Sequence, residues 1–319
     1  MTDGGLWFGE PPQAGQQPLL LVRASLHRRR SRYQTIEVLE TALFGRTLVL
    51  DQIIQTTERD EFFYHEMLVH PAMTAHPAPR RVLVIGGGDG GALRRVLEHG
   101  VEHATLVEID PEVVEVSRQH LPSVSAGAFD DPRAELVFQD GYAFVEERAA
   151  ARSAPRYDVV IVDAPDPIGP GKRLFTPAFY RALHDVLTED GLAVVQSESP
   201  LLMATQTAAT FLHLRGAFPT ARTYLGAVPA YPGVLWSFTI GSRRHDPAAV
   251  EPAELERRVQ ERGLLTQYYT PAVHRAAFAL PAFLERFLAD SAAAGEPADR
   301  HPFFPVAQGI TVAEPPPGG

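Results

Sequence analysis

Apolar and polar residues alternate in short runs through the first part of the chain, and this period of two predicts β-strands. The turn-like Phe44-Gly45-Arg46 separates the second run from the third. From Glu58 to Ala75 the apolar residues recur at helical spacing instead, and Pro77 and Pro79 close this helix. We therefore expect a small N-terminal β region over residues 1–57. Its predicted strands are Leu19–His27, Tyr33–Leu39 and Thr47–Leu50.

Beyond this helix, buried-strand runs and helical runs alternate strictly along the chain. Strands and helices in alternation are typical of a parallel, doubly wound sheet, so the predicted fold class is α/β. The predicted strands are Arg81–Ile85, Ala104–Ile109, Ala134–Phe138, Tyr157–Val162 and Gly191–Gln196. The predicted helices are Ala92–His99, Pro111–His120, Tyr142–Ala150, Pro177–Leu187 and Met203–Phe218.

The last third of the chain predicts an edge hairpin, helices and a tail. Two apolar runs, Ala221–Val228 and Val234–Ile240, are expected to form an antiparallel hairpin at the edge of the sheet. Helical patterns over Leu255–Arg262 and Ala282–Leu288 follow. The end of the chain is rich in Pro, Gly and Ala, so we expect a loosely held tail. The predicted domains are residues 1–57, 58–291 and 292–319.

Composition narrows the class of protein. Hydrophobic residues make up 45% of the 319 residues and charged residues 21%, which is ordinary globular usage. No run approaches the roughly 20 apolar residues of a membrane span, and we expect no secretion signal and no membrane partner. A net charge of −10 argues against a nucleic-acid partner and allows a cationic ligand. The absence of cysteine excludes disulfides and thiol chemistry, and we expect a cytoplasmic location.

A glycine-rich loop, Gly86 to Gly91, joins the first strand of the alternating region to its helix. Glycine permits a sharp turn and lets a ligand approach the backbone, so the loop indicates a cofactor site. Gly86, Gly88 and Gly91 fit the dinucleotide fingerprint, and Glu108 ends the next strand, where an acid binds ribose hydroxyls. The loop is not a P-loop, because no lysine follows the glycines. The alternative is a glycine turn that only packs helix on strand.

Acids near this loop change the expected ligand. Asp89 lies inside the loop, where a carboxylate repels a pyrophosphate but attracts a cofactor that carries a sulfonium or an amine. Asp110 before Pro111 is interpreted as a helix N-cap. Asp140, after the third strand, either accepts a hydrogen bond from an adenine amine or caps the next helix, and the local sequence favours neither.

Two more acids follow the fourth strand, in the stretch Asp163-Ala164-Pro165-Asp166-Pro167-Ile168-Gly169-Pro170-Gly171. Carboxylates on a loop stiffened by prolines and hinged by glycines suggest a lid over a ligand, and the alternative is an ordinary loop with solvated acids. Tyr64, Tyr231 and Trp236 supply aromatic faces elsewhere in the chain. Around one pocket, these rings and acids are what an alkyl diamine needs.

Two other kinds of site find no support. His65-Glu66 is followed by His70, but a zincin helix needs its second histidine where Val69 stands, so no metal site is expected. A G-x-S-x-G nucleophile elbow is also missing from the sequence, so serine hydrolase chemistry lacks support.

From about Ser31 to Leu288 the chain resembles the spermidine synthase family of polyamine aminopropyltransferases, and several motifs in the same order make the resemblance specific. Three departures from the family pattern are present, and those near Asp163 keep both acids but bear on the choice of acceptor. Asp51-Gln52 replaces the usual Asp-Gly, Ala164-Pro165 replaces small hydroxyl residues, and Val234 to Trp236 differs from the commonest acceptor wall. The matching motifs are Tyr33-Gln34, Gln55 to Phe62, Tyr64 to Met67, the Gly86 to Gly91 loop, Asp163 to Pro170 with Leu174 to Thr176, Tyr231 to Gly233, and Val273 to Phe278.

The resemblance implies a Rossmann-like methyltransferase-type sheet with a small N-terminal β domain, in a homodimer or homotetramer. It implies aminopropyl transfer from decarboxylated S-adenosylmethionine, a co-substrate, to a diamine, commonly putrescine, giving spermidine and 5′-methylthioadenosine without a tightly bound cofactor or a metal. The donor residues it implies are Gln34, Gly86, Gly88, Asp89, Glu108, Asp140, Gly141 and Pro170. The acceptor residues are Tyr64, His65, Asp89, Asp163, Asp166, Gln196 and Tyr231, with Gln55 and Trp236 as further candidates. The catalytic residues are Asp163 as proton acceptor, Asp166 and Tyr64.

Other functions remain as alternatives: aminopropyl transfer to agmatine, cadaverine or spermidine, a diamine N-methyltransferase, an NAD-dependent dehydrogenase, or a non-catalytic polyamine-binding protein. The interpretation requires one pocket on which five side chains converge. These are Asp89, Glu108, Asp140, Asp163 and Tyr231. Because acids stabilise an ammonium group against deprotonation, it also predicts activity that rises toward alkaline pH.

Overall fold

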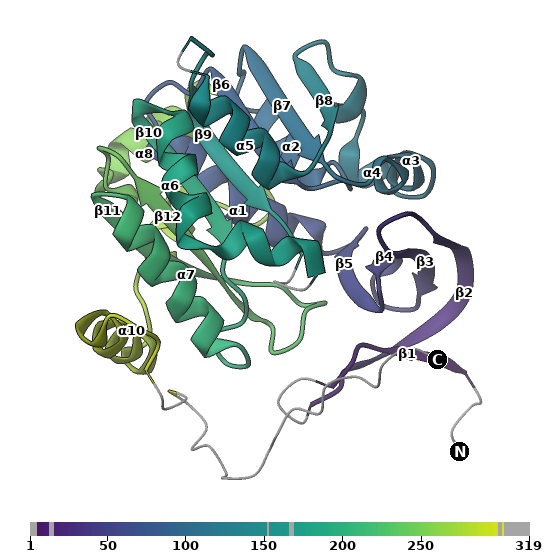
Figure 1. Ribbon diagram of the computed structural model, residues 1–319. Helices are drawn as coiled ribbons and strands as arrows, with labels where there is room; N and C mark the ends of the chain where they lie inside the picture. The colour runs from purple at the N-terminus through teal and green to yellow at the C-terminus, as the bar shows by residue number, and fades with distance from the viewer. Residues whose placement is uncertain (1–4, 13–15, 152, 166–168, 299–301, 303–319) are drawn as a thin grey trace.

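Two β-sheets organise the computed structural model, which describes residues 5–12, 16–151, 153–165, 169–298 and 302 (Figure 1). One is a five-stranded N-terminal sheet, and the other is a seven-stranded sheet with helices on both faces. The predicted α/β fold class is confirmed. Among the described residues, no helix is both long and apolar enough to cross a bilayer.

The strands of the N-terminal sheet are antiparallel and follow one another in chain order. The three predicted strands are confirmed, and two others were not predicted. β1 escaped prediction because apolar and polar residues do not alternate along it: the adjacent Leu6 and Trp7 are both apolar, and both are more than half exposed. β5 escaped because Ile53 and Ile54 are adjacent apolar residues. The strands are β1 (Leu6–Gly9), β2 (Leu19–Arg30), β3 (Thr35–Thr41), β4 (Gly45–Leu50) and β5 (Ile53–Thr57).

The two-residue turn between β4 and β5 carries backbone strain at Gln52. Asp51 and Gln52 have φ values of +45° and +72°, the left-handed region that glycine adopts most easily. Asp51 is tied in place, because its Oδ1 accepts a hydrogen bond from the Thr35 amide at 2.8 Å.

We therefore expect Gln52→Gly to stabilise the chain. The left-handed conformation costs an L-residue about 1–2 kcal/mol, of which the extra backbone entropy of glycine takes back about 0.5–1 kcal/mol. Denaturant unfolding at fixed protein concentration measures the gain. Leu43→Gly, in the neighbouring turn where φ is not positive, is the control and should give no gain. A lower unfolding midpoint for Gln52→Gly would contradict this explanation.

The large sheet has the strand order β11-β12-β10-β9-β6-β7-β8. β6 pairs in parallel with β7 on one side and with β9 on the other, so the direction of winding changes between β6 and β9. β12 is antiparallel to both β10 and β11, which confirms the predicted edge hairpin. The strands are β6 (Arg81–Gly86), β7 (His103–Glu108), β8 (Ala134–Phe138), β9 (Tyr157–Asp163), β10 (Leu187–Gln196), β11 (Thr220–Ala227) and β12 (Leu235–Ser242).

Helices cover both faces of this sheet, as side-chain alternation along its strands requires. Val82 and Val84 of β6 pack in one apolar cluster with α1 and α2, and Leu83 and Ile85 pack in a second cluster with α5, α6 and α7 (Figure 1). The helices are α1 (Glu61–Ala75), α2 (Gly91–Leu97), α3 (Pro111–His120), α4 (Pro122–Ser125), α5 (Gly141–Ala150), α6 (Pro177–Val186) and α7 (Ala204–Ala217). Short 3-10 helices are η1 (Ala128–Asp130), η2 (Gly169–Phe175) and η3 (Pro247–Ala249).

The N-terminal sheet packs on α3. Ile36 and Leu48 share an apolar cluster with Val113 and Val116. At the same junction, Asp110 caps α3 by accepting from the Glu112 amide at 3.1 Å, which confirms the predicted N-cap. Its other oxygen accepts a hydrogen bond from Ser31 Oγ at 2.6 Å.

Three helices follow the edge hairpin: α8 (Pro252–Glu261), α9 (Pro271–Ala277) and α10 (Ala282–Ala294). α9 was not predicted. α10 packs on α7 through Leu284 and Leu288 and includes the first three residues of the predicted tail, 292–294. Most of that predicted tail lies outside the described residues.

Candidate functional site

A cavity of about 320 Å³ lies where the carboxyl ends of the parallel strands meet the N-terminal sheet. β7, β6, β9 and β10 contribute Glu108, Gly86, Asp163 and Gln196 from their last positions. Between β10 and β8 the sheet takes four inter-strand steps, which is about 19 Å at the usual strand spacing. Asp89, Glu108, Asp140, Asp163 and Tyr231 all line this one cavity, as the interpretation of the sequence requires.

Gly86 and Gly87 hold the glycine loop close to the end of the neighbouring strand, β9. Gly86 has φ +78°, and a Cβ at that position would lie 2.1 Å from the Asp163 carbonyl oxygen. The Gly87 amide donates a hydrogen bond to the same oxygen at 2.9 Å. At Gly88 a Cβ would lie 2.9 Å from Glu108 Oε2, so a side chain there would collide with the carboxylate. Because these glycines lack side chains, the loop can approach both Asp163 and Glu108 closely.

Glu108 is a buried acid at the end of β7. Its Oε1 accepts a hydrogen bond from the Asp110 amide at 2.9 Å, and its side chain faces the cavity at the end of β7. Burial raises the pKa of Glu108 to about 7, although hydrogen bonds from the Asp110 and Ile109 amides act in the opposite direction. A carboxyl group in this position is suited to accept hydrogen bonds from a pair of hydroxyls.

Gln34 and Asp140 are two further polar residues of the cavity wall. Gln34 Nε2 donates to Asp110 Oδ2 at 3.0 Å, and Gln34 also lines the cavity. Asp140 caps α5, because its Oδ1 accepts from the Ala143 amide at 2.9 Å, and it lines the cavity with Gly141. Capping the helix and facing a ligand, the two alternatives for Asp140, are therefore compatible.

Asp163 is the acid at the winding change of the sheet. The Tyr64 hydroxyl donates to its Oδ1 at 2.8 Å, and its buried Oδ2 makes no hydrogen bond to a described residue. Burial and the nearby charge of Asp89 raise the pKa of Asp163 to about 6, and His65 and the Tyr64 hydrogen bond oppose that rise. A carboxylate whose pKa lies near neutrality can take a proton from a ligand at this position.

Aromatic side chains wall the cavity beside Asp163. The Tyr64 and Tyr231 ring centroids lie 5.6 Å apart, and Tyr231 meets Trp236 edge-on at 4.7 Å. The Tyr231 hydroxyl donates to the backbone oxygen of Gln55. Burial, together with Asp163, Asp89, Asp60 and Glu10, raises the pKa of Tyr231 well above its usual value. This phenol stays neutral among four carboxylates.

Two further polar residues complete this wall. Gln196 lines the cavity and donates from Nε2 to the Ala164 carbonyl at 3.2 Å and to Glu198 Oε1 at 3.1 Å. Glu10 also lines the cavity and is only 3% exposed, and its Oε1 accepts from the Ile54 amide at 2.7 Å. Sequence reasoning missed Glu10, because a single acid after the short strand β1 carries no pattern.

His65 requires a correction. It was expected to line the acceptor side, but it is not among the lining residues. It is fully buried behind Asp89, whose Oδ1 lies 3.4 Å from His65 Nε2. Tyr64 and His65 are neighbours on α1 and point to different sides of the helix, and the sequence motif does not show which of the two faces the cavity. The predicted roles of Asp166 and of the Pro170 side chain fall outside the described residues; the neighbouring Gly171 and Leu174 of η2 line the cavity.

Two groups of side chains among the described residues have ligand atoms within 4.8 Å of one another: His65 with Asp89 and Asp163, and His76 with Asp158 and Asp190. A metal needs a free lone pair on the histidine nitrogen that faces it. Each His65 nitrogen faces a carboxylate, and Asp89 and Glu61 raise the pKa of His65 to about 10 against the effect of burial, so both nitrogens keep a proton. His76 Nδ1 accepts a hydrogen bond from the Ala78 amide, so its Nε2 carries the proton. Both histidines are therefore arranged as proton donors.

Two family models match most of the described chain, up to residue 250. The spermine/spermidine synthase domain matches residues 61–250, and the spermidine synthase tetramerisation domain matches residues 6–58. The chain belongs to the spermine/spermidine synthase family. This confirms the resemblance found in the sequence motifs.

Individual relatives support the same family assignment. The polyamine aminopropyltransferase of Desulforudis audaxviator is 46% identical over 89% of this chain and 98% of its own, and that of Moorella thermoacetica is 44% identical over 89% and 96%. A crystal structure of spermidine synthase in complex with the transition state analogue AdoDATO has a TM-score of 0.84 at 38% identity and covers 91% of this chain and 97% of that one. Spermidine synthase from Thermotoga maritima has a TM-score of 0.81 at 36% identity, with 91% and 96% covered. The chain is accordingly an aminopropyltransferase, and its tetramerisation domain indicates an oligomer.

Proposed function

We propose that this aminopropyltransferase moves the aminopropyl group of decarboxylated S-adenosylmethionine to putrescine, and releases spermidine and 5′-methylthioadenosine. The observation that carries the proposal is the single cavity in which Asp89, Glu108 and Asp163 face a neutral aromatic wall. A sulfonium donor and a diamine are both cations with apolar stems, and both suit carboxylates beside aromatic rings.

The donor occupies the end of the cavity under β7 and β8. Glu108 accepts hydrogen bonds from the ribose hydroxyls, and Asp140 accepts one from the adenine amine. Asp89, in the glycine loop, binds the ammonium group of the aminopropyl chain. The AdoDATO complex of the similar spermidine synthase supports an adenosyl ligand in this cavity.

The acceptor occupies the end that Tyr231, Trp236 and Gln196 line. Its neutral amine attacks the propyl carbon next to the sulfonium, so a C–N bond forms as the C–S bond breaks and the electron pair goes to sulfur. The attacking nitrogen then gives its extra proton to Asp163, which the Tyr64 hydroxyl holds in position. Glu10 supplies a second buried carboxylate for the distal ammonium of a diamine, which favours putrescine over amines without a charge at that end.

One experiment tests this assignment against its alternatives. The protein is incubated with decarboxylated S-adenosylmethionine and, separately, putrescine, cadaverine, agmatine and spermidine, and the products are identified by mass. The expected result is spermidine and methylthioadenosine, formed fastest with putrescine. Parallel incubations replace the donor with ordinary S-adenosylmethionine or with NAD. A methylated diamine in the first, reduction of NAD in the second, or binding without turnover in all of them would each reject the proposal in favour of the corresponding alternative.

The proposed subunit contact uses the N-terminal domain, residues 1–57, while residues 58–291 carry most of the catalytic site. β1 and β2 expose large apolar side chains, among them Leu6, Trp7 and Leu19, each more than half exposed. Such a patch on a sheet edge is suited to pair with a second copy. We expect a homotetramer, and light scattering on the purified chain distinguishes it from a homodimer.

The pH dependence of the reaction follows from Asp163. Burial raises the pKa of Asp163 to about 6. Above that pH the carboxylate is ionised and can accept a proton, and below it the group is already protonated. We expect kcat/KM to fall as the pH decreases through about 6, and to rise toward alkaline pH as the acceptor amine loses its proton. Initial rates from about pH 5 to about pH 9 give the profile. A profile that is flat or falls between neutral and mildly alkaline pH would contradict the proton role.

A further inference from the structure

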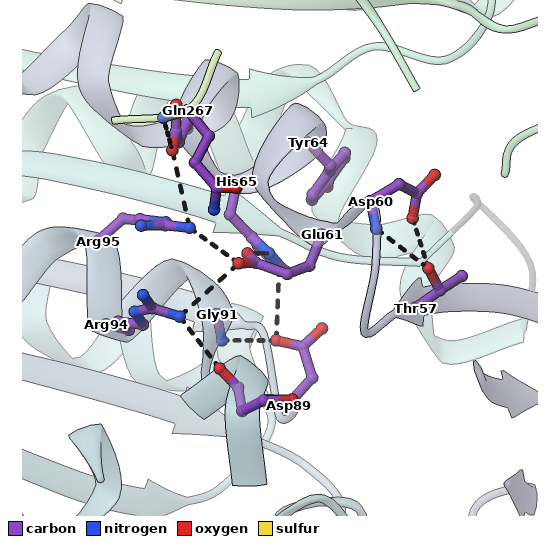
Figure 2. Close-up of polar contacts among 12 residues, drawn as sticks. Thr57, Asp60, Glu61, Tyr64, His65, Asp89, Gly91, Arg94, Arg95 and Gln267 are labelled. Atoms are coloured by element: carbon purple, nitrogen blue, oxygen red, sulfur yellow. Dashed lines mark hydrogen bonds and ion pairs between the residues drawn. The ribbon is translucent and has the colours of Figure 1, made fainter. Parts of the chain in front are cut away.

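A row of oppositely charged side chains runs from Asp89 through His65 and Glu61 to Arg94 and Arg95 (Figure 2). Glu61 Oε2 lies 2.9 Å from His65 Nδ1, and His65 Nε2 lies 3.4 Å from Asp89 Oδ1. All three side chains are less than a tenth exposed. Of the three, only Asp89 lines the cavity. Glu61 and His65 can therefore influence a ligand only through Asp89.

The row continues onto α2, which fixes Glu61 from the other side. Arg95 Nη2 lies 2.8 Å from Glu61 Oε1, and Arg94 Nη1 lies 3.7 Å from the same oxygen. Arg95 also lies 3.1 Å from Glu98 and 3.8 Å from Glu66. Each oxygen of the Glu61 carboxylate thus has a different partner, one an arginine and the other His65.

His65 is an imidazolium in this arrangement. A neutral imidazole has one N–H and can donate only one hydrogen bond, but His65 faces a carboxylate at each nitrogen. Burial alone would lower the pKa of His65, and the charges and hydrogen bonds of Asp89 and Glu61 raise it to about 10 instead. The cation is therefore retained at physiological pH.

By itself, this cation would cancel the charge of Asp89. Glu61 adds a second negative charge, and the charges of Arg94 and Arg95 are matched by those of Glu66 and Glu98. The whole group therefore keeps one net negative formal charge for a ligand in the cavity. We propose that Glu61 is a positioning residue that, through His65, holds Asp89 ionised and oriented toward the ammonium group of the donor. The inference rests on the proposed function, because it takes the aminopropyl donor as the ligand of Asp89.

Gly91 supports this role for the histidine. A Cβ added at Gly91 would lie 2.2 Å from His65 Cε1, and the Gly91 amide donates to Asp89 Oδ1 at 2.7 Å. The third glycine of the fingerprint thus makes room for the imidazole ring. Its φ is not in the left-handed region, so alanine there would displace the ring without straining the backbone.

Glu61→Gln tests the proposal, because it removes one charge and keeps the shape. With His65 still protonated, the site becomes one unit more positive, and we expect the KM for the donor to rise about tenfold or more near neutral pH. The kcat at saturating donor and the affinity for methylthioadenosine, which lacks the aminopropyl group, should change little. A purely structural defect would weaken both ligands and lower kcat.

The pH dependence gives a second readout. The ionisable groups that face His65 are Glu61 and Asp60 at the start of α1, Tyr64 beside it, Asp89 from the glycine loop and Asp163 from β9, and Arg94 and Arg95 face Glu61 from α2. Without Glu61, His65 loses its proton at lower pH. Asp89 then regains its net charge, so the donor defect of Glu61→Gln should shrink as the pH rises from about 7 to about 9.

Two further variants complete the test. Glu98→Gln is the matched control: it removes a carboxylate from the same two arginines, lies outside the cavity, and should leave the donor KM unchanged. Gly91→Ala should raise the donor KM while methylthioadenosine binding is retained, which keeps the proposal testable if Glu61→Gln does not fold. An unchanged donor KM in Glu61→Gln, or equal losses for donor and methylthioadenosine in both variants, would overturn the proposal. Failure of the wild-type chain to form spermidine would instead reject the proposed function.

Discussion

Asp163→Asn is expected to lower kcat by about 10²-fold or more, while methylthioadenosine still binds with nearly normal affinity. The amide has the shape of the carboxylate and can keep the 2.8 Å hydrogen bond from Tyr64, but it cannot take the proton of the attacking amine. Removal of a buried charge next to Asp89 should also weaken acceptor binding. Initial rates with varied donor and acceptor, together with calorimetric binding of methylthioadenosine, measure these effects.

Asp158→Asn is the matched control for this variant. Asp158 lies on the same strand, β9, near its opposite end, where its Oδ2 accepts hydrogen bonds from the Arg80 and Arg81 amides. Its substitution should leave kcat unchanged. Near-normal turnover in Asp163→Asn would reject Asp163 as the proton acceptor, and a parallel loss of methylthioadenosine binding would mean that the whole pocket has moved.

Gly86→Ala is expected to destabilise the chain by about 2–5 kcal/mol and to abolish donor binding. Two costs combine. The left-handed backbone at φ +78° strains any residue with a side chain, and the new Cβ would lie 2.1 Å from the Asp163 carbonyl oxygen. To relieve that contact, β9 must separate from β6 at the point where Asp163 faces the cavity. Denaturant unfolding and calorimetry with the donor measure the two effects.

Gly100→Ala separates these two costs. Gly100 has φ +68°, but a Cβ there would meet nothing within 4 Å. It should therefore show only the backbone strain, about 1–2 kcal/mol, and bind the donor normally. Equal destabilisation of the two variants would refute the steric part of the argument.

Much of the site was predictable because parallel strands all end at one edge of the sheet. An acid at the end of a buried strand or just after it, such as Glu108, Asp163 or Asp140, is thereby placed at that edge, whatever the rest of the fold does. The glycine loop adds a second local signal, because the backbone at Gly86 takes a conformation that other residues rarely adopt. Local chemistry and topology agree at these positions.

The residues that escaped prediction depend on contacts between distant elements. Glu10 reaches the cavity from the N-terminal sheet, and nothing in the short run around it indicates burial. His65 has the spacing of a site residue, yet the orientation of α1 turns it behind Asp89. The proposed role of Glu61 depends on the glycine loop, which brings Asp89 against His65, the partner of Glu61 on α1. The pattern of residues along one segment cannot show which other segments that segment will contact in the fold.

The N-terminal domain supplies part of the cavity wall through Glu10, Gln34 and Gln55. A ligand that touches both sheets binds only where they are docked, so by mass action its occupancy holds them together. If subunits associate through β1 and β2, the same sheet transmits that stabilisation to the oligomer. Substrate concentration would then tune how firmly the assembly resists dissociation, and dilution would in turn loosen the hold on substrate.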